Sequence, residues 1–223
     1  MISVLEVHAQ YVRRRTPVRM NTEAFGNAVI ALNRQYQQVR DLKTQIISDL
    51  SDVELNSMEN EWKTAYLKKI SNKIDNEIKD IGPADALNVV QKIGEEAMSS
   101  PELVARYTAN QDYNEFKKYA ISHKNDSELT TTDCKKMVND ACKKYGINIQ
   151  RLEYSNGNYQ DLGDALYVYS LVIIDRPRSY RDWLYLILLS AKCGNDDAIN
   201  QANDYQLLND NSMVRGHSST LFD

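Results

Sequence analysis

The sequence contains little glycine, proline and cysteine, and its apolar runs are short. Among 223 residues there are 8 Gly, 4 Pro and 3 Cys. Because so few turn-forming residues are present, the composition disfavours many short strands and favours long helices, so we expect a mainly α fold. Apolar residues make up 42% and charged residues 26% of the chain, which is ordinary for a globular protein with one sizeable core or two small ones.

The three cysteines, Cys134, Cys142 and Cys193, form no C-x-x-C pair and no spacing typical of a zinc site. Their odd number argues against a disulfide framework. Cys134 and Cys142 are eight residues apart and would share one helical face, where small apolar core residues are the expected interpretation. The sequence therefore predicts reduced thiols in a protein made in a cytosol.

Long hydrophobic segments are also missing. The longest apolar runs, "ALYVYSLVII" (165–174) and "WLYLILLSA" (183–191), are each about half of the roughly 20 residues that span a bilayer. The N-terminus, "MISVLEVHAQYVRRR", has no basic region followed by an apolar one, so it does not resemble a signal peptide. We expect no stable membrane span, and the two runs are predicted to be core segments.

Motifs for catalysis are absent from the sequence as well. It contains no G-x-x-x-x-G-K-[ST], no G-x-G-x-x-G and no H-E-x-x-H. Its histidines, His8, His123 and His217, fall in an arm, a linker and a tail, whereas metal and catalytic histidines are usually held on rigid structure. We predict no catalytic, cofactor-binding or metal site, and an enzyme of unrecognised type stays open as an alternative.

The sequence does contain two long amphipathic stripes. One series of apolar residues recurs at steps of three and four over 22–50, and a second does so over 52–81. Ser51 and Glu54 match the S-x-x-E capping box that begins a helix. We therefore predict an antiparallel helical hairpin with its turn at Asp49–Asp52, in which both stripes pack into the core. Trp62 is predicted to be largely buried against the first helix or a partner. The first series is Phe25, Val29, Leu32, Tyr36, Val39, Leu42, Ile46 and Leu50, and the second is Met58, Trp62, Tyr66, Ile70, Ile74, Ile78 and Ile81.

Further helices follow the hairpin. Pro83 suits the first turn of a third helix, and Ser100 can cap a fourth over 101–122. Beyond the polar stretch 122–132, Thr132 is a candidate cap for a helix that stops at Gly146. The segment 147–176 is rich in Val, Ile and Tyr, so helix and strand both stay open there. This pattern predicts three parts: an extended arm (1–21), a hairpin with two further helices (22–122), and a smaller, mainly helical region with a C-terminal tail (123–223).

Both ends of the chain are predicted to be extended and to bind partners. The arm carries four arginines against one glutamate, a balance of +3, within a chain whose net charge is −4. The remainder is therefore acidic and unsuited to wrapping DNA, which needs a broad cationic face. The arm residues are predicted to contact carboxylates of a partner protein, with DNA in a channel and a disordered arm as the alternatives. The predicted partner-binding residues are Arg13, Arg14, Arg15 and Arg19 in the arm, and Leu221 and Phe222 in the tail.

The hairpin region resembles a known class of proteins. The resemblance rests on three segments in this order: "TPVRMNTEAFGNAV", "DVELNSMENEWKTAYLKKISNKIDNEI" and "DALNVVQKIGEEAMSSPELVARYTANQDYNEFKKY". Over roughly residues 10 to 122 this order is similar to helical segments in virion proteins of tailed bacteriophages, the crassvirus-like podoviruses of gut bacteria being the nearest type. In those proteins an extended segment ending in proline, here Pro17, leads into a long helical hairpin.

The resemblance implies a non-enzymatic structural protein of the virion, made in the bacterial host cytoplasm and placed in the tail or portal-vertex assembly. Its partners would be other virion proteins and further copies of itself, with DNA nearby and no cofactor. Two alternatives stay open: an internal cargo protein ejected with the DNA, and a helical interaction module that binds nucleic acid through the basic arm.

Overall fold

The structure is a computed structural model, and it describes residues 22–123, 129–154, 156–176, 179–214 and 221–222. Within these ranges the fold is all helical, as predicted, with eight α-helices and three short 3₁₀ helices. The α-helices are α2 (Thr22–Asp52), α3 (Asn60–Ile78), α4 (Pro83–Met98), α5 (Pro101–Ser122), α6 (Thr131–Tyr145), α7 (Gln160–Ile173), α8 (Tyr180–Lys192) and α9 (Asp196–Asp204); the 3₁₀ helices are η1 (Ser57–Glu59), η2 (Ile149–Tyr154) and η3 (Ser212–Val214).

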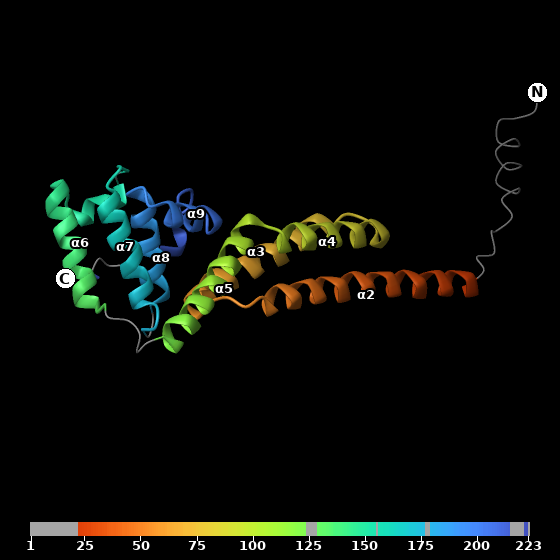
Figure 1. Cartoon of the computed structure of the whole chain (residues 1–223). Helices are drawn as coiled ribbons and strands as arrows, with labels where there is room; N and C mark the ends of the chain where they lie inside the picture. The colour runs from red at the N-terminus through yellow and green to blue at the C-terminus, as the bar shows by residue number, and fades with distance from the viewer. Residues whose placement is uncertain (1–21, 124–128, 155, 177–178, 215–220, 223) are drawn as a thin grey trace, which may run out of the picture.

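The helices α2, α3 and α4 form an up-down-up bundle, seen in Figure 1 as the long orange helix with the α3–α4 pair beside it. Its core includes Val39 and Leu50 from α2, Ile74 from α3 and Val90 from α4. Lys43 of α2 pairs with Asp75 of α3 at 2.6 Å, which shows the register of the two antiparallel helices in the predicted hairpin. The hairpin is therefore confirmed.

The predicted turn and capping box were wrong. Helix α2 continues through Ser51 to Asp52, and the chain then runs through a connection that includes η1 before α3 begins at Asn60. Asn56 provides the observed cap, because its side chain accepts a hydrogen bond from the Met58 amide at 3.1 Å. Leu50 is almost completely buried, so packing against the bundle holds the last turn of α2 in helical form past the local capping pattern.

This late turn shifts α3 along α2. Since Lys43 lies level with Asp75, Ile78 at the end of α3 is about level with Arg40. The part of α2 before Val39 is therefore uncovered, and Figure 1 shows it projecting beyond the tip of α3 and α4. The prediction that the whole first stripe packs inward was wrong for this half. Its four apolar residues are exposed: Phe25 by 61%, Val29 by 40%, Leu32 by 44% and Tyr36 by 41%.

Helices α4 and α5 begin and end close to the predicted positions because their terminal residues are strong local determinants. Pro83 and Pro101 each occupy the first turn. Ser100 caps α5 by accepting a hydrogen bond from the Leu103 amide at 3.3 Å. The cap of α6 is Thr130 rather than the predicted Thr132, because Asp133 completes a capping box with Thr130.

The second core surrounds α8. Every residue from Trp183 to Ala191 is buried, so this helix is apolar on all sides and is enclosed by its neighbours, chiefly α7 and α9. Within the segment 147–176, where the sequence was compatible with both helix and strand, residues 160–173 form the helix α7, which packs between α6 and α8. Cys134, Cys142 and Cys193 are free, buried thiols of this core. Burial raises the pKa of Cys193 to about 12, so the thiol form is favoured.

Helix α5 belongs to both cores. Leu103 near its start packs in the first core, whereas Ala109 and Tyr113 pack in the second. The two cores therefore meet within α5, on the N-terminal side of the division predicted after residue 122. A single rigid helix therefore joins the two bundles.

Candidate functional site

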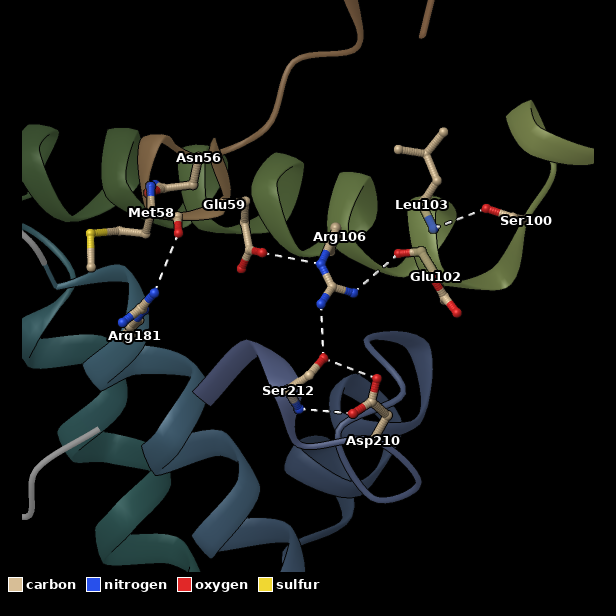
Figure 2. A network of polar contacts seen from close by, with 10 residues as sticks. All are labelled: Asn56, Met58, Glu59, Ser100, Glu102, Leu103, Arg106, Arg181, Asp210 and Ser212. Carbon is tan, nitrogen blue, oxygen red and sulfur yellow. Dashed lines mark hydrogen bonds and ion pairs between the residues drawn. The ribbon is translucent and has the colours of Figure 1, made fainter. Parts of the chain in front are cut away.

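Where the two cores meet, a cluster of side chains around the buried pair of Glu59 and Arg106 connects five elements, and we call it the joint: Glu59, Trp62, Arg106, Arg181 and Ser212. The Arg106 Nε donates to the Glu59 carboxylate at 3.1 Å, and both side chains are about 5% exposed or less. Figure 2 shows Arg106 pointing from α5 between Glu59 of η1 and Ser212 of η3. The joint thus brings together residues that are distant in the chain, such as Arg106 and Ser212, which are 106 positions apart.

The guanidinium of Arg106 donates hydrogen bonds through all three of its nitrogens and contacts an aromatic ring with one face. One terminal nitrogen donates to Ser212 Oγ at 2.8 Å, and the other donates to the Glu102 carbonyl at 3.4 Å. Its Cζ atom lies over the ring of Trp62, 4.1 Å from the ring centroid, and Trp62 stacks in turn on Tyr66. Arginine suits this position because its planar fork can donate in several directions while its face rests on an aromatic ring.

Further bonds support the joint. Asp210 accepts hydrogen bonds from both the amide and the hydroxyl of Ser212, at 2.9 Å each, and so holds that hydroxyl in place (Figure 2). Arg181 of α8 donates to the Met58 carbonyl at 3.4 Å. Burial raises the pKa of Glu59 above its usual value of 4.5, and the Arg106 guanidinium offsets only part of this rise. The joint is a structural clamp between the bundles.

Trp62 was expected to be largely buried against the first helix or a partner, and burial by a partner stays a prediction. Trp62 is only partly buried, and its ring lies between Tyr66 and Arg106. The late turn explains this, because the first turns of α3 lie beyond the end of α2 and face α5 instead. The hydroxyl of Tyr66 donates to the Ala97 carbonyl at 2.8 Å, so this aromatic pair joins α3 to the end of α4.

An open groove of about 870 Å³ lies at the other end of the molecule, between the end of α5, the start of α6 and the end of α7. Phe116, Leu129 and Val172 contribute apolar surface, and Arg176 contributes a charge. The volume falls in the range of ligand pockets. Over the ranges that the structure describes, no group of three or more His, Cys, Asp or Glu side chains is arranged to hold a metal ion.

The predicted partner-binding residues are placed as follows. Arg13, Arg14, Arg15 and Arg19 lie outside the described residues. Leu221 is buried in the second core, where its carbonyl accepts a hydrogen bond from the Tyr169 hydroxyl at 3.1 Å. Phe222 packs edge-on against the ring of Tyr169. These contacts are made within the chain, and contact of Leu221 and Phe222 with a partner stays a prediction.

The sequence analysis missed two features of this structure. Arg106 and Asn110 lie on the buried face of α5 between Leu103 and Tyr113, and polar residues at apolar spacing could have indicated a buried polar contact. Asn110 also donates across to the Glu54 carbonyl at 3.1 Å. The exposed half of α2 could have been found only by knowing where α3 begins.

Comparison with known proteins adds no relative. No protein-family model, no curated protein and no solved structure matches the chain. Among the described helices, none is long and apolar enough to cross a membrane. The interpretation of function therefore depends on the chain's own surfaces and on the resemblance of residues 10–122.

Proposed function

We propose that the chain is a non-enzymatic structural component of a tailed-bacteriophage virion, held in the tail or portal-vertex assembly by protein–protein contacts. The observation that carries the proposal is the projecting half of α2. Phe25, Val29, Leu32 and Tyr36 form one apolar stripe there, on a helix that extends past its own bundle. An exposed apolar stripe on a rigid element is typical of a surface that a partner covers.

The rest of the architecture supports the same function. The two bundles are connected by one helix and by the buried joint of Glu59 and Arg106, so the chain holds its ends at a fixed separation. A subunit of an assembly needs this property, because each contact surface has to meet its neighbour in a defined place. The resemblance to phage virion proteins covers the projecting helix and the Glu59–Arg106 pair, and the arginine-rich arm immediately precedes that helix.

The proposal is tested in purified particles of the phage that encodes the chain. Quantitative mass spectrometry should find several copies in each particle, and labelled antibodies should place them at the tail or portal vertex. The copies should remain after the genome has been ejected. Absence of the chain from particles would refute the proposal.

The alternatives predict different results in the same experiment. A cargo protein would leave the particle with the DNA. A nucleic-acid-binding module would bind random duplex as an isolated chain, and the logarithm of its affinity would fall with the logarithm of salt concentration by about 0.9 for each phosphate neutralised. Replacing the four arm arginines with alanine would abolish that binding, whereas the proposed function predicts reduced incorporation into particles.

A further inference from the structure

The exposed stripe on α2 continues a stripe that is buried further along the same helix. Phe25, Val29, Leu32 and Tyr36 follow one another at steps of four, three and four, and the same alternation leads on through Val39, Lys43, Ile46 and Leu50. This spacing is the seven-residue repeat of helices that pack side by side. Where the stripe is buried, α3 and α4 cover it. The element that fits its exposed part is therefore another helix.

We infer that the projecting half of α2 pairs with the same half of α2 in a second copy of the chain, antiparallel, about a twofold axis midway between Val29 and Leu32. The inference rests on the proposed function, in which protein contacts hold the chain, and it names the partner for one of those contacts. A twofold interface requires a surface that is complementary to itself.

The order of side chains along the stripe meets this requirement. It has an aromatic residue at each end and two aliphatic residues between them, and the spacing of four, three and four reads the same in both directions. An antiparallel second copy therefore places Phe25 against Tyr36 and Val29 against Leu32. A different helical partner would need no such symmetry in the stripe.

The residues that flank the stripe favour a second copy as well. In paired helices, charges beside the apolar seam select the partner. Here the flanking residues are uncharged: Gly26, Ala28, Asn33 and Gln35. The charged residues of this half, Glu23 and Arg34, fall on the opposite face of the helix by its 100° step per residue. Two identical seams can therefore meet without repulsion.

Gly26 is an independent observation at the same surface. A glycine within a helix is destabilising compared with alanine, so it usually has a structural reason. Nothing among the described residues gives one, since a β-carbon added at Gly26 would meet none of their atoms within 4 Å. In the antiparallel pair the longer Asn33 side chain of the second copy lies opposite Gly26, where the missing β-carbon leaves room for it.

The size of the contact predicts a weak dimer. The uncovered segment from Glu23 to Gln38 is about 24 Å long, which is two repeats of the seam. Phe25 and Tyr36 expose 61% and 41% of their surface, so these two residues offer roughly 200 Å² in each copy. The surface that two copies could bury along this short seam is below the roughly 1,000 Å² of a stable interface. The pairing therefore depends on concentration and is strengthened by neighbouring contacts in an assembly.

Sedimentation velocity of the full chain, at concentrations up to about 1 mM, tests the pairing. The wild type should shift from monomer to dimer as its concentration rises. Leu32→Asp places a charge in the seam and should raise the dissociation constant by about tenfold or more. Ile30→Asp is the matched control, because Ile30 is 52% exposed on the same helix but lies off the seam. Both residues are exposed, and equal helical circular dichroism would show that the variants fold.

The direction of pairing is tested with single cysteines. Val29→Cys chains are mixed with Leu32→Cys chains and treated with a short thiol cross-linker, while the three native thiols stay protected by burial. Antiparallel pairing should cross-link unlike chains in preference to like ones. Preferential linkage of like chains, a wild type that stays monomeric, or equal effects of Leu32→Asp and Ile30→Asp would each overturn the inference. A monomeric chain that is still found in particles would leave the proposed function intact.

Discussion

Replacing Arg106 with leucine is expected to destabilise the joint strongly. The variant keeps the apolar stem but leaves the Glu59 carboxyl buried without its cationic partner, and it removes the hydrogen bond to Ser212 at 2.8 Å. Loss of one partner from a buried ion pair costs about 3–5 kcal/mol. A cost at the lower end of this range is expected here. Burial already raises the pKa of Glu59, so the unpaired carboxyl can take up a proton instead of remaining as a buried charge.

Urea unfolding followed by tryptophan fluorescence measures this cost, because Trp62 lies at the joint and Trp183 lies in the second core. The matched control is Lys73→Ala, which removes an ion pair with Glu96 whose side chains are about half exposed. That variant should cost less than about 1 kcal/mol. If Arg106→Leu costs no more than Lys73→Ala, the joint does not hold the bundles together.

Three other changes probe particular contacts. Gly94→Ala would bring its β-carbon to 2.7 Å from the Ile46 side chain. Alanine raises helix propensity, but the close contact should outweigh that gain and lower the free energy of unfolding by about 1 kcal/mol. A stabilised variant would contradict this packing. Trp62→Ala should cost roughly 2 kcal/mol, less than for a fully buried Trp, and an unchanged urea midpoint would show that its ring contacts contribute nothing. Because the pKa of Glu59 is raised above 4.5, the folded chain binds a proton at this carboxyl more tightly than the unfolded chain does. The wild type should therefore lose stability relative to Glu59→Gln as the pH rises from below 4.5 through the raised pKa. Urea titrations at several pH values measure this difference, and a relative gain over the same range would reverse the predicted sign.

Much of the secondary structure could be predicted from the sequence because its determinants are local. Pro83, Pro101 and Ser100 act within one turn of the chain, and the helices α4 and α5 begin where these residues lie. Gly146 ends α6 in the left-handed conformation that glycine favours (φ 65°). These features depend on neighbouring residues alone, so a pattern in the sequence was sufficient to locate them.

The remaining features depend on contacts that are distant in sequence. Ser51 and Glu54 have the right spacing for a capping box, but burial of Leu50 carries α2 through them. Arg106 meets Glu59 across 47 positions, and no local periodicity encodes that meeting. The same limit applies to the exposed half of α2, whose stripe has an ordinary core pattern and is uncovered only because α3 begins late.

The central claim is that the projecting half of α2 holds this chain within a virion, and incorporation into particles tests it most directly. Tagged wild-type, Leu32→Asp and Ile30→Asp chains would be expressed in the bacterial host during infection by the phage that encodes the protein. Purified particles would then be analysed by quantitative mass spectrometry. The account predicts that the wild type and Ile30→Asp enter particles and that Leu32→Asp is largely excluded. Equal incorporation of all three chains, or incorporation of none, would contradict it.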